Sequence, residues 1–202
     1  MGLISESLEQ INQDKEALRR YYEMTDLGEM GWILSIRVTC DCDKGMISLS
    51  QEKFIREVLE CYGMTNACPI STPALANEHL VKLPSPKINA KVYQRALGSI
   101  MYPMLGTWPD LGYAIAALGH HMANPGPNHQ CALECMLRYL QATADHQLVL
   151  SRSTSSSPTL LGYADADWAS DINDRKSMLG YVFTLGGGAV SWSLKKQTTV
   201  AL

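Results

Sequence analysis

The chain has 202 residues, of which 46% are hydrophobic and 18% are charged, and its formal net charge is −3. These values are typical of a globular protein and exclude a disordered, collagen-like or coiled-coil chain. No apolar run approaches the roughly 18–20 residues that a membrane helix needs, so we expect no membrane partner. Residues 1–70 hold 7 basic and 12 acidic residues, residues 71–150 hold 5 and 4, and residues 151–202 hold 5 and 4. Because phosphate contacts dominate nucleic-acid affinity, this lack of a basic excess argues against strong nucleic-acid binding.

The first third of the chain predicts a helix, a β-hairpin and a second helix. Apolar residues recur at helical spacing over residues 3–24, where Ser7 and Gln10 favour a capping box. Residues 31–40 alternate partly and are rich in Ile, Val and Trp, and together with the turn DCDKG and the short strand MISLS they predict a hairpin. Residues 51–64, QEKFIREVLECYGM, then predict an amphipathic helix.

The middle of the chain predicts a helical unit. Four prolines between residues 68 and 89 indicate an irregular connector. The helical patterns YQRALGSIMYPML, PDLGYAIAALGHHM and NHQCALECMLRYLQAT follow within residues 91–143. We expect this unit to bury seven apolar side chains: Leu97, Ile100, Ile115, Leu118, Leu133, Leu137 and Leu140. A short strand, HQLVLS, and a serine-rich joint, SRSTSSSP, come next, and the joint is the best candidate for a domain boundary.

The last quarter predicts a sheet. Its strand candidates are LLGYADAD, SMLGYVFTL and AVSWSL, and the turn signal GGG joins the last two. We therefore expect a three-stranded antiparallel meander over residues 159–194. Helices followed by strands indicate the α+β class. The chain divides on this basis into segments 1–66, 67–150 and 151–202.

The six cysteines form no CxxC pair, and the amino terminus, MGLISESLEQ, has neither the basic start nor the apolar core of a secretory signal. We therefore expect reduced thiols and an intracellular location, in the cytoplasm or the nucleus. A zinc site is one interpretation of the stretch that holds His120, His121, His129, Cys131 and Cys135. Zinc ligands pair at tighter, repeated spacings, whereas Cys131 and Cys135 fit one helix face, so we expect packed residues there.

The sharpest chemical feature is the pair Asp165 and Asp167 in YADADW. Alternate side chains of a strand share a face, so the two carboxylates project together. Such a pair suits Mg²⁺, and in two-metal hydrolysis carboxylates hold the ions that activate water. The alternative is that both aspartates lie at the end of the strand and cap the polar turn that follows, and spacing alone favours this alternative.

The motifs resemble one family over nearly the whole chain. The run LLGYADADWASDINDRKSMLGYVFTLGGGAVSWSLKKQTTVAL resembles the opening of the ribonuclease H domain in copia-type retrotransposon Pol polyproteins. The segments YEMTDLGEMGWILSIRV and LSQEKFIREVLECYGM resemble the reverse transcriptase of the same family. The stretch YQRALGSIMYPMLGTWPDLGYAIAALGHHMANPGPNHQCALECMLRYLQAT resembles its GSLMY, TRPD and LRYL block.

The resemblance implies a fold and a set of segments. Residues 1–66 would be the palm end of the reverse transcriptase, with a helix, a hairpin and a helix. Residues 67–150 would be helices like those of the thumb and connection, and residues 151–202 an incomplete ribonuclease H-like meander. The implied partner is an RNA–DNA hybrid or a template–primer duplex, and the implied cofactor is Mg²⁺.

The resemblance also implies what is catalytic. The family's polymerase site is a Tyr-x-Asp-Asp motif, which does not occur in this chain. The family's ribonuclease H site uses four carboxylates, and the resemblance matches only the first of them, to Asp165. That match implies that Asp165 is both a catalytic and a metal-binding residue. The other three carboxylates would come after Leu202. One carboxylate of four cannot hold two Mg²⁺ ions, since each ion needs several oxygen ligands. We therefore expect Asp165 to be vestigial and the chain to be inactive.

Other positions bear on nucleic-acid binding. Lys195 and Lys196 match the family's KKQ block and are weak candidates for backbone contacts, with a plain exposed turn as the alternative. The family's arginine in TRPD is Trp108 here, which lowers any inherited binding. Trp168 and Trp192 are expected to pack on a strand face rather than to stack on bases.

Three hypotheses follow: an inactive fragment of a retrotransposon polyprotein, a domesticated module that binds RNA–DNA hybrids or other nucleic acid, and a ribonuclease H that is active only with a complementing partner. A sheet with one uncovered face is poorly stabilised, so we expect residues 151–202 to be marginally stable alone and to self-associate through that face.

Overall fold

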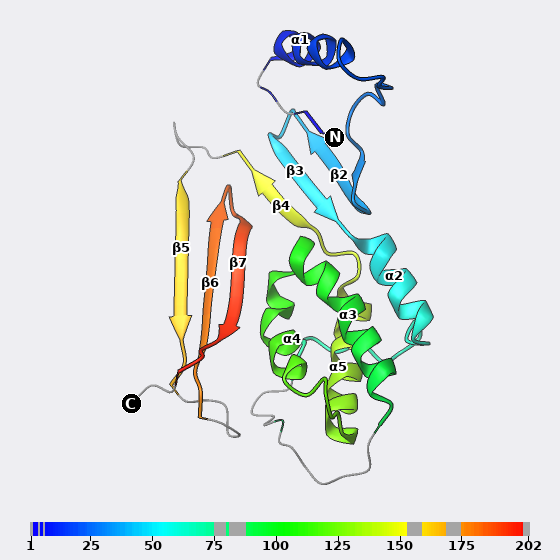
Figure 1. The fold of residues 1–202 in the computed structure, drawn as a ribbon, viewed down its shortest axis with the longest axis vertical. Coiled ribbons are helices and arrows are strands. Elements are labelled where there is room, and N and C mark those ends of the chain that lie inside the picture. Colours follow the sequence, from blue (N-terminus) through cyan, green and yellow to red (C-terminus); the bar gives the residue numbers. More distant parts are fainter. Residues whose placement is uncertain are drawn as a thin grey trace.

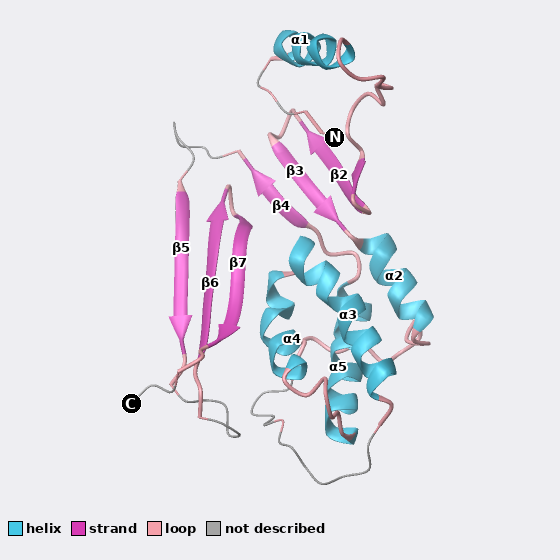
Figure 2. Cartoon of the chain, viewed as in Figure 1, coloured by secondary structure: helices cyan, strands magenta, loops and turns pink. Residues whose placement is uncertain are grey.

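The computed structural model describes residues 2–3, 5, 7–74, 80, 88–152, 159–168 and 175–199. Figure 1 shows a helix at one end, a first sheet beneath it, a helical bundle below that sheet, and a second sheet beside the bundle. Helices and strands are both well represented and occupy separate layers (Figure 2), in agreement with the predicted mixture of helix and antiparallel sheet. Among the described residues, no helix combines the length and the apolar character needed to cross a membrane.

The amino-terminal third contains the predicted helix, hairpin and helix. The elements are α1 (Leu8–Arg19), β1 (Trp32–Ile33), β2 (Ile36–Asp41), β3 (Met46–Ser50) and α2 (Glu52–Cys61). The stretch expected to be one strand from residue 31 is divided, because Leu34 and Ser35 adopt φ values of 49° and 60°. Two successive left-handed residues make a tight turn, so β1 folds back and pairs with β2.

The first sheet has the order β1-β2-β3-β4, and β4 (Leu148–Ser151) comes from the far side of the helical region. It pairs antiparallel with β3, from Met46 opposite Ser151 to Leu49 opposite Leu148. Strands on both sides of the helices are therefore joined by backbone hydrogen bonds, and segments 1–66 and 67–150 share one sheet.

The helical core consists of α3 (Ala90–Gly106), η1 (Pro109–Leu111), α4 (Gly112–Gly119) and α5 (Pro127–Thr143), with α2 packed against it. The side chain of Asn89 caps α3 by accepting from the Lys91 N–H at 3.1 Å. All seven apolar side chains predicted for this core are buried, and none is more than 5% exposed. The buried apolar residues of the described chain all lie between Ile55 and Ala144, so this bundle supplies the hydrophobic core.

The second sheet is the predicted meander, formed by β5 (Leu160–Ala166), β6 (Met178–Leu185) and β7 (Gly188–Lys196). Its inner face meets the bundle through β7, where the Trp192 Nε1–H donates to the Met104 carbonyl oxygen at 2.9 Å. Its outer face is exposed, as the alternating exposure along β6 records. One face of the sheet is thus partly covered by helices and the other is open.

Helix α1 departs from expectation at its start. Ser7 is the N-cap residue, but its side chain makes no capping hydrogen bond, so the predicted capping box is wrong. Gln10 instead donates to Asp14 at 3.0 Å. A side-chain amide has a partner one turn further along the helix surface, and that local bond competes with the cap.

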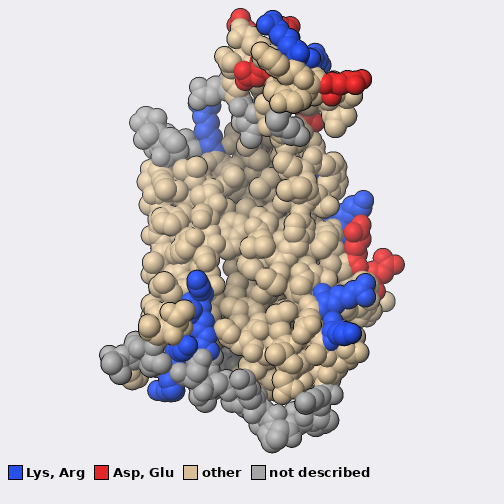
Figure 3. Space-filling view, viewed as in Figure 1, with Lys and Arg blue, Asp and Glu red and all other residues tan. Residues whose placement is uncertain are grey.

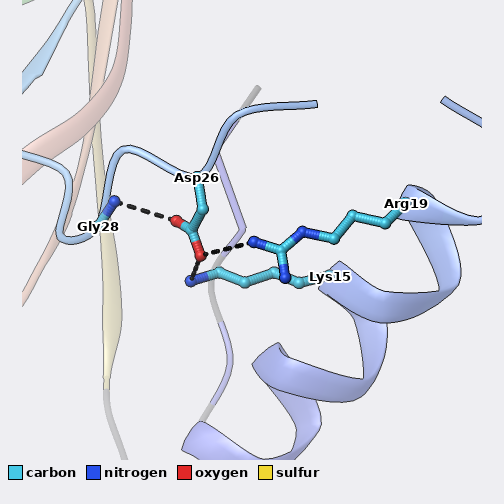
Figure 4. A network of polar contacts seen from close by, with 4 residues as sticks. All are labelled: Lys15, Arg19, Asp26 and Gly28. Carbon is cyan, nitrogen blue, oxygen red and sulfur yellow. Dashed lines mark hydrogen bonds and ion pairs between the residues drawn. The ribbon is translucent and has the colours of Figure 1, made fainter. Parts of the chain in front are cut away.

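Polar contacts attach α1 to the chain that follows it, as Figure 4 shows. Asp26 accepts from Lys15 Nζ at 2.9 Å, lies 3.5 Å from Arg19 Nη2, and accepts from the Gly28 N–H at 3.0 Å. The Lys15 hydrogen bond, followed by the Gly28 one, holds the pKa of the Asp26 carboxyl below its usual value. No residue of α1 is buried, so these contacts hold the helix without help from the hydrophobic core.

Candidate functional site

The two aspartates of the YADADW motif have different roles in the structure. Asp165 lies on β5 opposite Gly180 and its side chain is exposed. Asp167 follows the end of β5: its N–H donates to the Met178 carbonyl at 3.1 Å and its Oδ1 accepts from the Met178 N–H at 2.8 Å. Asp167 therefore closes the β5–β6 ladder, as the capping alternative predicted for that residue.

Asp165 lines a cleft of about 1030 Å³ between the second sheet and the helices α3 and α4. Most of the lining is apolar and comes from both sides, including Met101, Met104, Ile115, Tyr163, Val182 and Trp192. The ionisable side chains on the lining are Asp110, His120, Asp165, Lys195 and Lys196, together with tyrosines. The two lysines and the aspartate singled out from the sequence are thus brought to one cleft.

Four basic residues gather at the end of this sheet, and Figure 3 shows Lys and Arg side chains clustered there. Lys195 and Lys196 end β7, and β6 places Leu179 and Met178 opposite them. Arg175 and Lys176 directly precede β6 and so lie at the same end. We call Arg175, Lys176, Lys195 and Lys196 the basic corner. Only the two lysines of β7 were predicted from the sequence, although Arg175 and Lys176 belong to the basic DRKS block.

The two tryptophans of the sheet differ from each other. Trp192 is half-buried and bonded to Met104, as expected for a side chain that packs on a strand face. Trp168 is 72% exposed at the end of β5, so the expectation that it packs on the strand is wrong. It follows Asp167, which has already left the strand, and a residue beyond the ladder has no facing strand to cover it. An exposed indole therefore stands at the same end of the sheet as the basic corner.

The described residues contain no group of three or more His, Cys, Asp or Glu side chains that could hold a metal ion. Asp165 lies near Asp167, whose Oδ1 is already used by the Met178 N–H. Two Mg²⁺ ions require several carboxylate oxygens between them, and this arrangement does not fit such a pair of ions.

Two of the three histidines considered for zinc are packed, whereas His120 is exposed and lines the cleft. His121 and His129 are 5% and 1% exposed, and their rings stack with centroids 3.9 Å apart. His129 Nδ1 accepts from the Gly126 N–H at 2.8 Å, which fixes its tautomer at the start of α5. Burial lowers the pKa of His129, so its ring is neutral near pH 7. Cys131 is exposed on α5 and Cys135 is partly exposed, so the expectation that these residues are packed is wrong for Cys131.

Trp108 belongs to the core, not to a surface that contacts a ligand. It is 4% exposed, its ring stacks on His146 at 6.0 Å and it meets Tyr139 edge-on at 6.2 Å. The Tyr139 hydroxyl donates to Asp110, and burial together with that bond raises the pKa of the hydroxyl. The indole at position 108 thus fills the space between η1 and the end of α5.

Comparison with known proteins identifies relatives among transposon polyproteins. The chain is 42% identical over 195 residues to the retrovirus-related Pol polyprotein from transposon TNT 1-94 of Nicotiana tabacum, which is 93% of this chain and 14% of the polyprotein. It is 38% identical over 159 residues to the Pol polyprotein from transposon RE2 of Arabidopsis thaliana, which is 76% of this chain and 10% of the polyprotein. The chain therefore spans a small part of these polyproteins.

A third relative is of another kind. The chain is 48% identical over 110 residues to the secreted RxLR effector protein 161 of Plasmopara viticola, which is 54% of this chain and 76% of that protein. No family model matches the chain. No solved structure matches it either.

Proposed function

Since this chain belongs to the family of copia-type retrotransposon Pol polyproteins, we propose that it is the part of such a polyprotein in which reverse transcriptase adjoins ribonuclease H, and that alone it catalyses neither reaction. The observation that carries the proposal is that, among the residues the structure describes, Asp165 belongs to no group of three or more side chains that could hold a metal ion. Asp167, two positions along the chain, is bonded to the backbone of β6. The chain also contains no Tyr-x-Asp-Asp sequence, the motif expected to carry the polymerase aspartates.

A cleavage assay tests this proposal. The 202-residue chain and its Asp165→Asn variant are incubated with a labelled RNA–DNA hybrid in Mg²⁺ and in Mn²⁺, and the RNA fragments are resolved on a gel. We expect both proteins to give the background of a protein-free control, because a lone carboxylate leaves the metal ions without most of their oxygen ligands. Cleavage by the unaltered chain that disappears in Asp165→Asn would overturn the proposal.

A specific observation favours a second function, which is weak binding of the phosphate backbone of an RNA–DNA hybrid. The basic corner places four cations at one end of the second sheet, the end at which the exposed indole of Trp168 also lies. Cations that follow a phosphate backbone and an aromatic ring that stacks on a base are the usual parts of a nucleic-acid surface. The net charge of −3 opposes this attraction at long range, so we expect the affinity to be low.

Binding is tested by fluorescence anisotropy of a labelled hybrid between 25 and 200 mM salt in the absence of divalent ions. Each phosphate contact contributes a slope of about −0.9 in log K against log salt, so the double variant Lys195→Gln/Lys196→Gln should flatten the slope by about 1.8. Lys91→Gln, an exposed lysine at the start of α3, is the matched control and should leave the slope unchanged. Equal slopes for all three proteins would contradict a role for the basic corner.

A further inference from the structure

One end of the second sheet is held together across all three strands. The Asp167 N–H donates to the Met178 carbonyl at 3.1 Å, and Met178 lies opposite Lys196 on β7. Beyond the two strands, the Gln197 N–H donates to the Ser177 carbonyl at 2.8 Å. The residues that follow β5, precede β6 and end β7 are therefore fixed side by side, and the basic corner belongs to the last two of these segments.

Trp168 presents its indole to solvent at this same end. It directly follows Asp167, and its side chain is 72% exposed. Neighbouring strands lie about 4.8 Å apart, so two spacings place the backbone of Trp168 on the order of 10 Å from the lysines of β7. A few nucleotides span such a distance. An exposed indole also offers a large apolar surface, which a base that stacks on it removes from water.

The charges at this end of the sheet favour an anion, although the whole chain carries a net charge of −3. Among the residues that the structure describes there, the four cations of the basic corner outnumber the two carboxylates, those of Asp165 and Asp167. Asp165, opposite Gly180, lies on the inner side of the sheet. Lys195, opposite Leu179, lies on the outer side. A phosphate group that approaches the corner from the outer side therefore meets a positive surface.

We propose that Trp168 and the basic corner bind single-stranded nucleic acid in preference to an RNA–DNA hybrid. This inference rests on the proposed binding of a phosphate backbone by the basic corner, and it names the kind of nucleic acid that suits the site. The bases of a single strand are free to stack on an exposed ring, and each such contact strengthens binding by about 5- to 150-fold. The bases of a hybrid are already stacked and paired, so the indole reaches one only by separating neighbouring base pairs.

Charge alone predicts the opposite preference. A duplex carries two phosphates at each step where a single strand carries one, and each phosphate contact contributes a salt slope of about −0.9 in double-stranded DNA and about −0.7 in a single strand. A surface that used only its cations would therefore bind the hybrid more tightly. The order of the two affinities thus reveals whether the indole takes part in binding.

Fluorescence anisotropy of the complete chain at about 50 mM salt, without divalent ions, tests the proposal. The probe is a labelled DNA strand of about 20 nucleotides without self-complementarity, either alone or annealed to its complementary RNA. We expect the unaltered chain to bind the single strand more tightly than the hybrid. Trp168→Ala should weaken binding to the single strand by about 5- to 150-fold and leave the affinity for the hybrid nearly unchanged, so that the preference reverses.

Two further variants complete the experiment. Tyr21→Ala is the matched control, because it removes an aromatic side chain that is 82% exposed. Tyr21 follows α1, which lies at the opposite end of the molecule (Figure 1), so both affinities should stay as they are in the unaltered chain. Lys195→Gln/Lys196→Gln should weaken binding to both ligands, because both carry phosphates. Circular dichroism verifies beforehand that each variant is folded.

The outcomes separate this inference from the proposed function. A hybrid bound as tightly as the single strand or more tightly would overturn the inference. So would a Trp168→Ala variant that loses nothing, or that loses equally for both ligands. In these cases a loss in the lysine variant would still support the basic corner as a phosphate site. If the unaltered chain binds neither ligand, the inference and the proposed binding both fail.

Discussion

His129 shows how a single buried side chain ties stability to pH. Its ring is 1% exposed, lies against the ring of His121, and accepts the Gly126 N–H at Nδ1. Protonation at Nδ1 would break that hydrogen bond and place a charge in an apolar corner, and burial accordingly lowers the pKa of His129. The α4–α5 turn therefore depends on a neutral imidazole.

We predict that the chain loses stability as the pH falls below about 6.5. Above this value, the ordinary pKa of histidine, His129 is neutral in both the folded and the unfolded chain. Below it, the unfolded chain binds a proton that the folded chain does not, so the free energy of unfolding falls until the lowered pKa of folded His129 is reached. Urea denaturation at pH 7.5, 6.0 and 5.0 measures this loss.

A pair of variants assigns the effect. His129→Asn retains a side-chain acceptor for the Gly126 N–H but does not titrate, so its loss of stability between pH 7.5 and 5.0 should be smaller than that of the unaltered chain. Leu133→Ala, in the buried face of the same helix, removes no titrating group, so it should lower stability at every pH but keep the full loss between pH 7.5 and 5.0. Equal pH dependence in all three chains would show that His129 does not contribute.

At the scale of elements, α1 is held differently from every other helix. It buries no residue, and its described attachment is the contact of Lys15 and Arg19 with Asp26. Exposed ion pairs of this kind contribute little, and salt screens them. Hydrogen exchange should therefore show α1 amides exchanging far faster than those of α3 and α5, and Asp26→Asn or 0.5 M salt should accelerate α1 alone. Protection of α1 equal to that of α3 would contradict this prediction.

The elements that the sequence predicted well are those with local patterns. The apolar repeats of α3 to α5 identified both the helices and their seven buried residues, because one stripe of each helix must face the core. The meander could also be predicted from the sequence, because its strands alternate and its turn contains Gly186 and Gly187. These two residues adopt positive φ values of 57° and 81°, which glycine allows.

What escaped prediction depends on contacts between distant residues or on unusual backbone. Leu34 and Ser35 have positive φ without being glycine or asparagine, so no residue type signalled the turn that divides β1 from β2. The pairing of β4 with β3 spans about a hundred residues, and periodicity gives no partner for a strand. At the site, spacing placed Asp165 and Asp167 together, but only the structure shows Asp167 engaged with Met178.

At the scale of the whole molecule, the helical bundle contains the hydrophobic core, and the second sheet is stabilised by its contacts with the bundle. The second sheet has no buried apolar side chain among its described residues, and it meets the rest of the chain along one strand and one corner. Trp192 bonds to Met104, and the Ser151 N–H donates to the Gly186 carbonyl at 2.8 Å. A unit with few buried apolar contacts opens at lower free energy than the core.

We therefore predict two unfolding transitions, with β5 to β7 opening before α3 to α5. Hydrogen exchange in increasing urea separates them, because each peptide reports its own element. Trp192→Phe removes the hydrogen bond to Met104, so it should lower the unfolding free energy of the first transition by about 1 kcal/mol. The free energy of the second transition should stay unchanged.

Leu140→Ala provides the opposite case, because Leu140 is fully buried in the bundle on which the sheet rests. It should lower the unfolding free energy of the second transition by about 2–5 kcal/mol. Where the bundle then becomes the less stable unit, the sheet should unfold together with it. The sheet depends on the bundle, but the bundle has its own core and does not depend on the sheet. A single transition in which all elements lose protection together, and which both variants shift equally, would mean that the sheet is part of one cooperative core.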